Sequence, residues 1–392
     1  MVVAEKMTVD ERYKYLRLMH ARYEQADGSE RERLLDEVVA MTGLHRKYVC
    51  HLLNKEGPIR KSRQHQRGRK YGLRVTTAVR LVADALDWIC AERLQPALPK
   101  TAAHLATFGE LLVDEPLLEQ LRVISVSTVA RLLKHLRQDE PRLARRRGVA
   151  PHSGLGATIP MTRLPWDLQE PGHFELDLVH HCGPRASGDY LCTLQWLDVA
   201  TAWSERVAVY GRSAREMQEA FGKVLSRCPF PIREIHPDNG SEFLNHPLIA
   251  FFGQKVSGVH LSRSRPFQKN DNRFVEQKND TLVRAFLGHA RLDTRAQCAL
   301  LNDIYDAMWV YYNLFQPVLR QTEKDYERTP AGVLRVHRRH DTARTPFERL
   351  LATPALSHQA REDLWAIYEV TNPRQLKREI QEQLDLLLST ST

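Results

Sequence analysis

The sequence predicts an α/β core with a mixed sheet flanked by helices, an all-α region before it and a small helical region after it. Three observations carry this prediction. Before Pro141, apolar residues recur at the three- and four-residue spacing of helices, whereas after Pro171 they alternate as in strands. A Gly/Pro-rich stretch over 151–170 separates the two patterns. The elements after Pro171 follow the order βββαβαβα, which is typical of a mixed sheet with helices on its faces.

Residues 1–57 are predicted to form a helix-turn-helix DNA-binding domain. Apolar residues recur at helical spacing over 10–24, 29–41 and 45–53, and Gly43 lies at the turn between the last two helices. A glycine suits a turn that requires a positive φ. Arg46, Lys47 and Tyr48 then lie on the exposed face of the last helix, where base edges and phosphates are contacted. A plain helical hairpin with a solvated basic face is the alternative.

Residues 58–74 are predicted to be a basic arm. The segment from Pro58 to Lys70 carries six positive charges and no negative one, and it has no apolar face to bury. Along a DNA groove it would neutralise several phosphates and make binding steeply dependent on salt. A solvated linker is the alternative. The cations are Arg60, Lys61, Arg63, Arg67, Arg69 and Lys70.

Residues 75–150 are predicted to form a second helical DNA-binding domain. Helical patterns cover 75–93, 100–112 and 125–137, and residues 127–134 resemble a second, weaker recognition helix. Pro141 and a run of arginines end this region, and 151–170 is the linker.

Residues 171–316 are predicted to form the α/β core. Strands are expected over 173–179, 190–198 and 202–210, and Ser213 begins a capping box that opens a helix. A strand over 232–236, a helix near 247–254, a strand over 258–262 and helices over 271–289 and 294–316 follow. The C-terminal region, 317–392, begins with a polar basic stretch and continues with helices near 357–368 and 373–388. This region could bind DNA, bridge subunits or cover the core.

Charge and composition narrow the class of protein. Residues 1–150 hold 28 Lys and Arg against 19 Asp and Glu, whereas 151–392 hold 29 of each, so the whole net charge of +9 lies in the first 150 residues. A basic part joined to a neutral one favours nucleic acid over a membrane surface as the polyanionic partner. With 42% hydrophobic residues the chain is not disordered.

Location and redox state follow from what the sequence lacks. It contains neither an apolar run of about 18 residues nor the apolar core of a signal peptide. We therefore expect a cytoplasmic protein that does not associate with a membrane. Its six cysteines contain no C-x-x-C pair, so they are expected to be reduced thiols and to hold no zinc.

Three acidic residues are candidates for chemistry. Asp177 lies in the middle of a predicted strand, where a charge is costly unless a cation or hydrogen bonds compensate for it. Asp238 lies where a strand ends and a turn begins, and Glu276 lies early on a long helix. Such hard oxygen ligands suit Mg²⁺, and a pair of ions can catalyse phosphodiester transfer. Taken singly, Asp238 could merely hold a turn and Glu276 could be a solvated helix residue.

The sequence around these acids resembles the DDE transposases of bacterial insertion sequences, within the retroviral-integrase superfamily. The resemblance covers about 171–316, and the three acids are separated by 60 and 37 residues. The matching segments are Gly172–Asp177, His236–Phe243, and Lys269–Asn272 followed by Val275–Asn279. A helix-turn-helix front end is also usual in such proteins.

This resemblance implies a ribonuclease-H-like fold and catalysis by two Mg²⁺ or Mn²⁺ ions per active site. Asp177 would bridge both ions, and Asp238 and Glu276 would each hold one. Water would free a 3′-OH at each end of a mobile element, and that 3′-OH would attack target DNA without a covalent protein–DNA intermediate. The partners implied are double-stranded DNA and further copies of the chain, in the bacterial cytoplasm at the nucleoid. The alternatives are a nuclease of the same fold without joining activity and a catalytically silent DNA-binding regulator.

Several residues near the triad have alternative interpretations. Residues 255–295 form a basic band, from which Lys269, Arg273 and Lys278 are predicted to contact DNA. The run His180, His181, Cys182 has no second ligand cluster and is interpreted as a strand end or loop. Asp198 and Glu242 are spare acids that could support the site.

Overall fold

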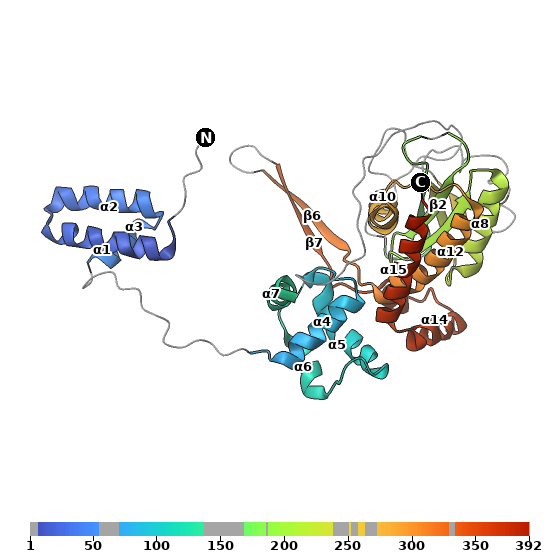
Figure 1. The fold of residues 1–392 in the computed structure, drawn as a ribbon, viewed down its shortest axis with the longest axis horizontal. Coiled ribbons are helices and arrows are strands. Elements are labelled where there is room, and N and C mark those ends of the chain that lie inside the picture. The colour runs from blue at the N-terminus through green and yellow to red at the C-terminus, as the bar shows by residue number, and fades with distance from the viewer. Residues whose placement is uncertain are drawn as a thin grey trace. The chain divides into compact units, whose positions relative to one another are not determined.

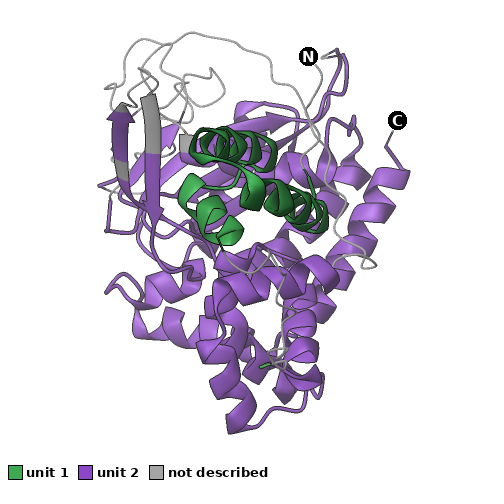
Figure 2. Cartoon of the chain, turned by 90° about the vertical axis from the view of Figure 1, so that its left-hand side faces the viewer, with its two compact units in different colours: residues 1–70 green, residues 71–392 purple. Residues whose placement is uncertain are grey.

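The structure is a computed structural model that describes residues 7–54, 70–136, 168–185, 187–237, 251, 258–262, 273–328 and 334–391 (Figure 1). The chain divides into two compact units, residues 1–70 and 71–392, which Figure 2 shows in green and purple. Each unit is described on its own. Among the described residues, no helix has the length and apolar character needed to cross a membrane.

The first unit contains the three helices predicted for it. They are α1 (Val9–Gln25), α2 (Gly28–Thr42) and α3 (Arg46–Leu53). The expected positive φ at Gly43 is confirmed: φ is 66°, and its N–H donates to the carbonyl of Val39 at 2.9 Å. Leu16, Leu34 and Val49 are almost fully buried between the helices, so each helix contributes one apolar face to a small core.

The second unit begins with four helices, one more than the sequence patterns predicted. They are α4 (Leu73–Ala85), α5 (Ala91–Thr107), α6 (Glu115–Val123) and α7 (Val126–Leu136). The prediction of one helix over 75–93 was wrong, because the backbone turns at Asp87 and Trp88, where φ is positive. α5 begins well before the predicted residue 100 and continues through Pro96 and Pro99.

A five-stranded mixed sheet forms the centre of the second unit. Its strands are β1 (His173–His180), β2 (Leu191–Asp198), β3 (Ser204–Tyr210), β4 (Glu234–Pro237) and β5 (His260–Leu261). The order across the sheet is β3-β2-β1-β4-β5. β1, β2 and β3 are antiparallel, whereas β4 runs parallel to β1 and β5 parallel to β4. This order and these directions confirm the predicted ribonuclease-H-like fold.

The two faces of the sheet differ in polarity because strand residues alternate. One face carries Phe174 and Trp196, and α8 (Ala214–Arg227) packs on it through Phe221, whose ring centroid lies 5.4 Å from that of Trp196. Glu175 and Asp177 lie on the opposite face of β1. Helices from the last third of the core cover that polar face.

The two long helices predicted over 271–289 and 294–316 both contain a π-helical segment. The first consists of α10 (Arg273–Lys278), the π-helix η2 (Asn279–Arg284) and α11 (Ala285–Leu287). The second consists of α12 (Arg295–Val310) and the π-helix η3 (Tyr311–Phe315). The helix predicted near 247–254 lies outside the described residues except for the helical Phe251.

The C-terminal region contains a hairpin that the sequence did not predict. Its strands are β6 (Gln321–Arg328) and β7 (Leu334–His340), which form a two-stranded antiparallel sheet of their own. Three helices follow: α13 (Pro346–Leu351), α14 (His358–Val370) and α15 (Pro373–Ser389). The two helices predicted near 357–368 and 373–388 are confirmed by α14 and α15.

Helices α4 to α7 share one hydrophobic core with the sheet and the C-terminal helices. Val79 and Leu98 belong to the same cluster of buried residues as Phe174. The Tyr311 hydroxyl donates to the carbonyl of Ala85 at 2.8 Å, and Arg374 on α15 binds the carboxylate of Asp84 on α4 at 2.6 Å. Residues 73–136 therefore lie in the same compact unit as the sheet.

Candidate active site

Asp177 projects from the middle of β1 on the polar face of the sheet. It is half-buried and lies opposite Gln195 of β2. Its Oδ1 accepts a hydrogen bond from the backbone N–H of Leu178 at 2.8 Å, and its Oδ2 accepts one from Nδ2 of Asn279 at 2.5 Å. The amide of Asn279 therefore joins β1 directly to the helix that follows Glu276.

Glu175 is a site residue whose role the sequence analysis missed. It lies two residues before Asp177, on the same face of β1, and its side chain is fully buried. Its Oε2 accepts hydrogen bonds from the backbone N–H groups of Phe274 at 2.8 Å and Val275 at 2.9 Å. These N–H groups belong to the first turn of α10, where no intrahelical acceptor is available. A carboxylate at this position also interacts favourably with the helix dipole.

Glu276 follows these two capped residues on α10, and its side chain is exposed. Asn279, three residues further along the chain, is buried and begins η2. Because Asn279 binds Asp177 and Glu175 binds the start of α10, both ends of this helical segment are fixed to β1.

The third predicted acid, Asp238, lies outside the described residues. The residue before it, Pro237, ends β4 and pairs in parallel with Leu176, the residue before Asp177. The register His173 with Glu234 through Leu176 with Pro237 is unbroken. β4 therefore ends at Pro237 beside Leu176, next to the level of the sheet where Asp177 lies.

The oxygen atoms at Asp177 are of the kind that binds a hard divalent cation. Asp177 supplies carboxylate oxygens, and Oδ1 of Asn279 is a buried amide oxygen that has no hydrogen-bond partner among the described residues. Carboxylate and amide oxygens are the ligands that Mg²⁺ and Ca²⁺ prefer. Among all the residues that the structure describes, no group of three or more His, Cys, Asp or Glu side chains is arranged to hold a metal ion.

The predicted DNA-contacting residues of this unit have different environments. Lys278 is half-buried, and its Nζ donates to the hydroxyl of Tyr312 at 2.5 Å while lying 5.0 Å from the ring centroid. The backbone of Arg273 begins α10. Lys269 and the spare acid Glu242 lie outside the described residues. Lys278 is thus held against an aromatic side chain in this structure.

His181 has a structural role, as the interpretation of its run as a strand end implied. It is fully buried, and its Nε2 shares a hydrogen bond with Oγ1 of Thr193 at 2.7 Å. That hydroxyl in turn lies 2.6 Å from the hydroxyl of Tyr305 on α12. Burial, reinforced by the positive charge of Arg284, lowers the pKa of His181 to about 3. The imidazole is therefore neutral in the folded protein.

A neutral buried histidine makes stability depend on pH. The unfolded chain binds a proton at His181 near pH 6.5, whereas the folded chain does not until about pH 3, so stability falls as the pH decreases through this window. Between pH 7 and pH 5, we expect wild type to lose about 2 kcal/mol more unfolding free energy than His181→Gln. Urea denaturation at both pH values measures the difference. Equal losses in the two proteins would show that His181 titrates normally.

Asp198, the other spare acid, closes the turn between β2 and β3. Its Oδ2 accepts from the backbone N–H of Thr201 at 2.8 Å and from its hydroxyl at 2.6 Å, and its Oδ1 accepts from the backbone N–H of Gly172 at 2.8 Å. It is fully buried on the face of the sheet opposite Asp177. The interpretation of Asp198 as an acid that could support the site of Asp177 is therefore wrong.

The predicted recognition residues of the first unit are all exposed. Arg46, Lys47 and Tyr48 lie in the first turn of α3, and Arg46 forms an ion pair with Asp36 of α2. In the arm, Lys70 is described and exposed. The other predicted arm residues lie outside the described residues: Arg60, Lys61, Arg63, Arg67 and Arg69.

No known family model matches the chain. The chain is 32% identical over 326 residues to the uncharacterized protein y4rM of Sinorhizobium fredii, and the match covers 82% of this chain and 91% of that protein. The chain therefore belongs to the same family as y4rM.

Three solved structures show weaker similarity. The catalytic core domain of BIV integrase is 14% identical, with a TM-score of 0.28, over 37% of this chain and 85% of that one. The HTLV-2 integrase catalytic core domain in complex with magnesium is 18% identical, with a TM-score of 0.28, over 39% of this chain and 93% of that one. The simian T-cell lymphotropic virus intasome in complex with PP2A regulatory subunit B56 gamma is 13% identical, with a TM-score of 0.30, over 56% and 70%. Because these TM-scores are low, the ribonuclease-H-like fold is assigned from the strand order and directions.

Proposed function

We propose that the protein is a DNA transposase, a polynucleotidyl transferase that frees 3′-OH ends on a mobile element and joins them to target DNA. The observation that carries this proposal is the fixing of α10 to β1. Glu175 and Asn279 hold the helix of Glu276 against the strand of Asp177, and β4, whose last residue Pro237 precedes Asp238 in the sequence, pairs with the same strand. In this proposal the three carboxylates, which are distant in sequence, meet at one edge of the polar face.

In this proposal Asp177, Asp238 and Glu276 hold two Mg²⁺ or Mn²⁺ ions. Such ions would activate the attacking hydroxyl and stabilise the leaving oxygen of the phosphodiester. The chain itself orients the ligands: Asn279 holds one carboxylate oxygen of Asp177, and Glu175 fixes the helix that carries Glu276. An outer layer of hydrogen bonds of this kind sets the geometry of metal ligands.

The first unit would supply recognition of the element ends. Arg46, Lys47 and Tyr48 lie in the first turn of α3, which is the part of a recognition helix that contacts base edges. Double-stranded DNA is therefore the proposed partner. Because two ends must be joined to one target, we propose that the protein acts as a homo-multimer.

The test is processing and joining of a labelled duplex that carries the terminal inverted repeat flanking the gene. We expect joined products with wild type and Mg²⁺, and none after addition of a chelator. Asp177→Asn and Glu276→Gln should each lower cleavage at least about a thousandfold. The three carboxylates act as one catalytic unit, so loss of any one of them removes most of the activity. DNA affinity should stay nearly unchanged.

Matched controls separate the site from a general loss of charge. Asp303→Asn on α12 and Glu219→Gln on α8 remove exposed carboxylates elsewhere in the unit and should leave cleavage intact. Cleavage without joining by wild type would favour a nuclease. Tight binding with neither reaction would favour a DNA-binding regulator. Wild-type cleavage by Glu276→Gln would remove Glu276 from the site.

A further inference from the structure

The hairpin of β6 and β7 extends away from the helices of its own unit (Figure 1). The described side chains of β7 are exposed, as are those of β6 from Thr322 onwards, with Tyr326 exposed by 58%. A two-stranded hairpin alone is only marginally stable in water. The hairpin is therefore a candidate interaction surface.

The register divides the charges of the hairpin between two faces. Residues directly opposite each other on the two strands share a face, and successive pairs lie on opposite faces. The pair Glu323 and Arg339 therefore lies on one face, and the next pair, positions 324 and 338, on the other. The paired face holds three acids and three potential cations: Glu323, Asp325, Glu327, Arg335, His337 and Arg339. The alternate register positions, which we call the basic face, have three cations, one aromatic residue, two apolar residues and no acid in the sequence: Lys324, Tyr326, Arg328, Leu334, Val336 and Arg338.

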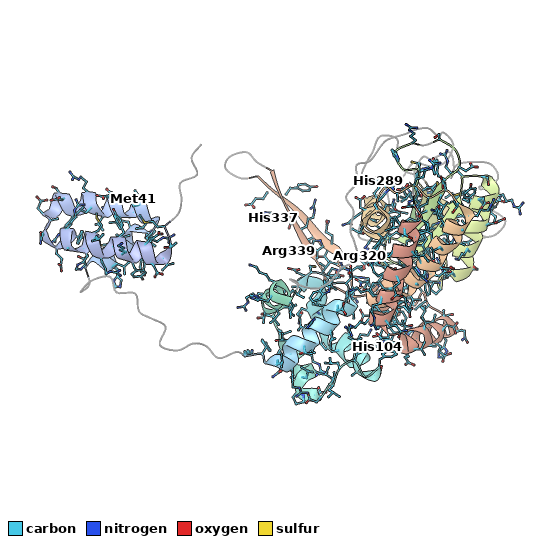
Figure 3. All side chains as sticks on the ribbon, in the orientation of Figure 1. Met41, His104, His289, Arg320, His337 and Arg339 are labelled. Atoms are coloured by element: carbon cyan, nitrogen blue, oxygen red, sulfur yellow. The ribbon has the colours of Figure 1, made fainter. Side chains whose placement is uncertain are left out.

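The paired face neutralises much of its own charge. Glu323 binds Arg339 at 2.9 Å, and Glu327 binds His337 at 3.0 Å. Figure 3 labels His337 and Arg339 on the hairpin. On the basic face, by contrast, Arg338 forms no ion pair with the described residues, and the register places it directly opposite Lys324. Like charges directly opposite each other destabilise a strand pair.

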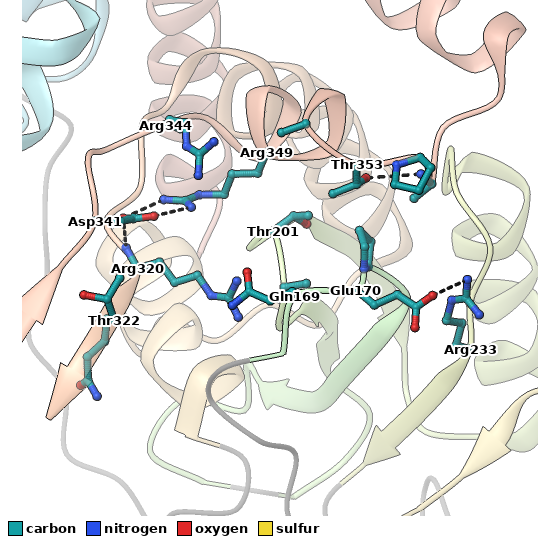
Figure 4. Close-up of a pocket in the computed structure, with 16 residues that line it drawn as sticks. Gln169, Glu170, Thr201, Arg233, Arg320, Thr322, Asp341, Arg344, Arg349 and Thr353 are labelled. Carbon is teal, nitrogen blue, oxygen red and sulfur yellow. Dashed lines mark hydrogen bonds and ion pairs between the residues drawn. The ribbon is translucent and has the colours of Figure 1, made fainter.

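The root of the hairpin is held by a buried network, which Figure 4 shows at the edge of a cavity of about 670 Å³. Asp341, just after β7, accepts from the backbone N–H of Arg320, just before β6, at 2.9 Å. Arg349 binds the same carboxylate at 2.6 Å, and its own side chain is 6% exposed. Both strands thus leave the core from one fixed point.

We propose that the basic face binds the phosphate backbone of duplex DNA. A polyanion would offset the like charges that the register places opposite each other at positions 324 and 338, and Tyr326 adds an exposed aromatic residue to the same face. A two-stranded ribbon is also one of the elements that the major groove of DNA admits. The inference rests on the proposed function, because it takes DNA as the substrate.

The adjacent arginines Arg338 and Arg339 provide a matched pair for the test. Both substitutions to Gln remove one charge from the same strand, but only Arg338 lies on the basic face. The double variant Lys324→Gln, Arg338→Gln should bind a fluorescent 30-base-pair duplex of arbitrary sequence about tenfold more weakly than wild type. It should also lower the slope of log affinity against log salt by about two. Arg339→Gln should stay close to wild type, because Glu323 already neutralises Arg339.

Each outcome of this anisotropy titration decides the proposal. Wild-type affinity and slope in the double variant, or an equal loss in Arg339→Gln, would overturn it while leaving the proposed function intact. A change in oligomeric state by sedimentation, with unchanged DNA binding, would assign the basic face to another copy of the chain and overturn it as well. Absence of DNA binding by wild type would overturn both, whereas absence of cleavage with the expected binding pattern would overturn only the proposed function. Unchanged unfolding temperatures verify that the variants are folded.

Discussion

Glu175→Ala is expected to lower DNA cleavage at least about a hundredfold, although Glu175 is proposed to bind no metal and to touch no DNA. The substitution leaves the N–H groups of Phe274 and Val275 without the carboxylate that accepts from them. Small displacements of catalytic groups cause losses of this size, and α10 carries Glu276. Each unsatisfied donor costs about 1–3 kcal/mol, so unfolding free energy should fall by about 2–4 kcal/mol.

Two measurements separate positioning from simple loss of stability. Amide hydrogen exchange at Phe274 and Val275 should accelerate in Glu175→Ala, while exchange in α8, on the other face of the sheet, should not change. Glu175→Gln keeps an acceptor oxygen and should recover part of the cleavage activity. Full activity in a folded Glu175→Ala protein would show that α10 is positioned by other contacts.

Glu205→Ala is expected to cause the largest loss of stability, about 3–5 kcal/mol of unfolding free energy. Glu205 lies on β3 and is fully buried. Its Oε1 accepts from the indole N–H groups of Trp203 at 2.8 Å and Trp309 at 2.7 Å, and its Oε2 binds Arg227 at 2.7 Å. Alanine would leave two buried indole donors and part of a guanidinium without an acceptor.

The isosteric variant makes the prediction about Glu205 specific. Burial raises the pKa of Glu205 despite the positive charge of Arg227, so the charge itself is costly in this position. Glu205→Gln removes the charge and keeps an acceptor oxygen. Its loss of unfolding free energy should therefore be less than half of the loss in Glu205→Ala. Urea denaturation at pH 7 measures both variants. Equal losses would show that the charge, and not the acceptor, stabilises this network.

Much of the fold could be predicted because the patterns are local. The alternation over 173–210 predicted β1, β2 and β3, and the glycine at 43 predicted the left-handed turn before α3. The helix predicted from residue 100 begins instead at Ala91, because burial of Leu94, Leu98 and Leu105 on one side of α5 outweighs the hydrogen bonds that Pro96 and Pro99 cannot make. Tertiary packing of this kind cannot be read from spacing.

The hairpin could not be predicted, because both of its faces lack the apolar stripe by which strands are recognised. Its alternation is one of charge, with acids at every second position of β6 from Glu323 to Glu327. That signal was present in the sequence. It indicates a strand only when the register with β7 shows that the acids face their partners.

The site was predictable in part. The sequence segments around Asp177 and Glu276 made both residues candidates, and period-two alternation already placed Glu175 on the face of Asp177. What the sequence could not predict is that Glu175 caps a helix about a hundred residues away, since that contact exists only after the sheet and α10 have packed together. The bond from Asn279 to Asp177 is of the same long-range kind.

The core shared by α4 to α7 with the sheet restricts how such a chain can diversify. Asp84 is bound by Arg374 and Lys377 from α15, and Lys100 of α5 binds Glu348 of α13 at 2.8 Å. Each of these pairs links one end of the second unit to the other, so replacing residues 73–136 alone would leave charged partners behind. All of these pairs lie within residues 71–392, the second unit. We therefore expect the two ends of the second unit to be inherited together, whereas exchange of the first unit would leave all of these pairs in place.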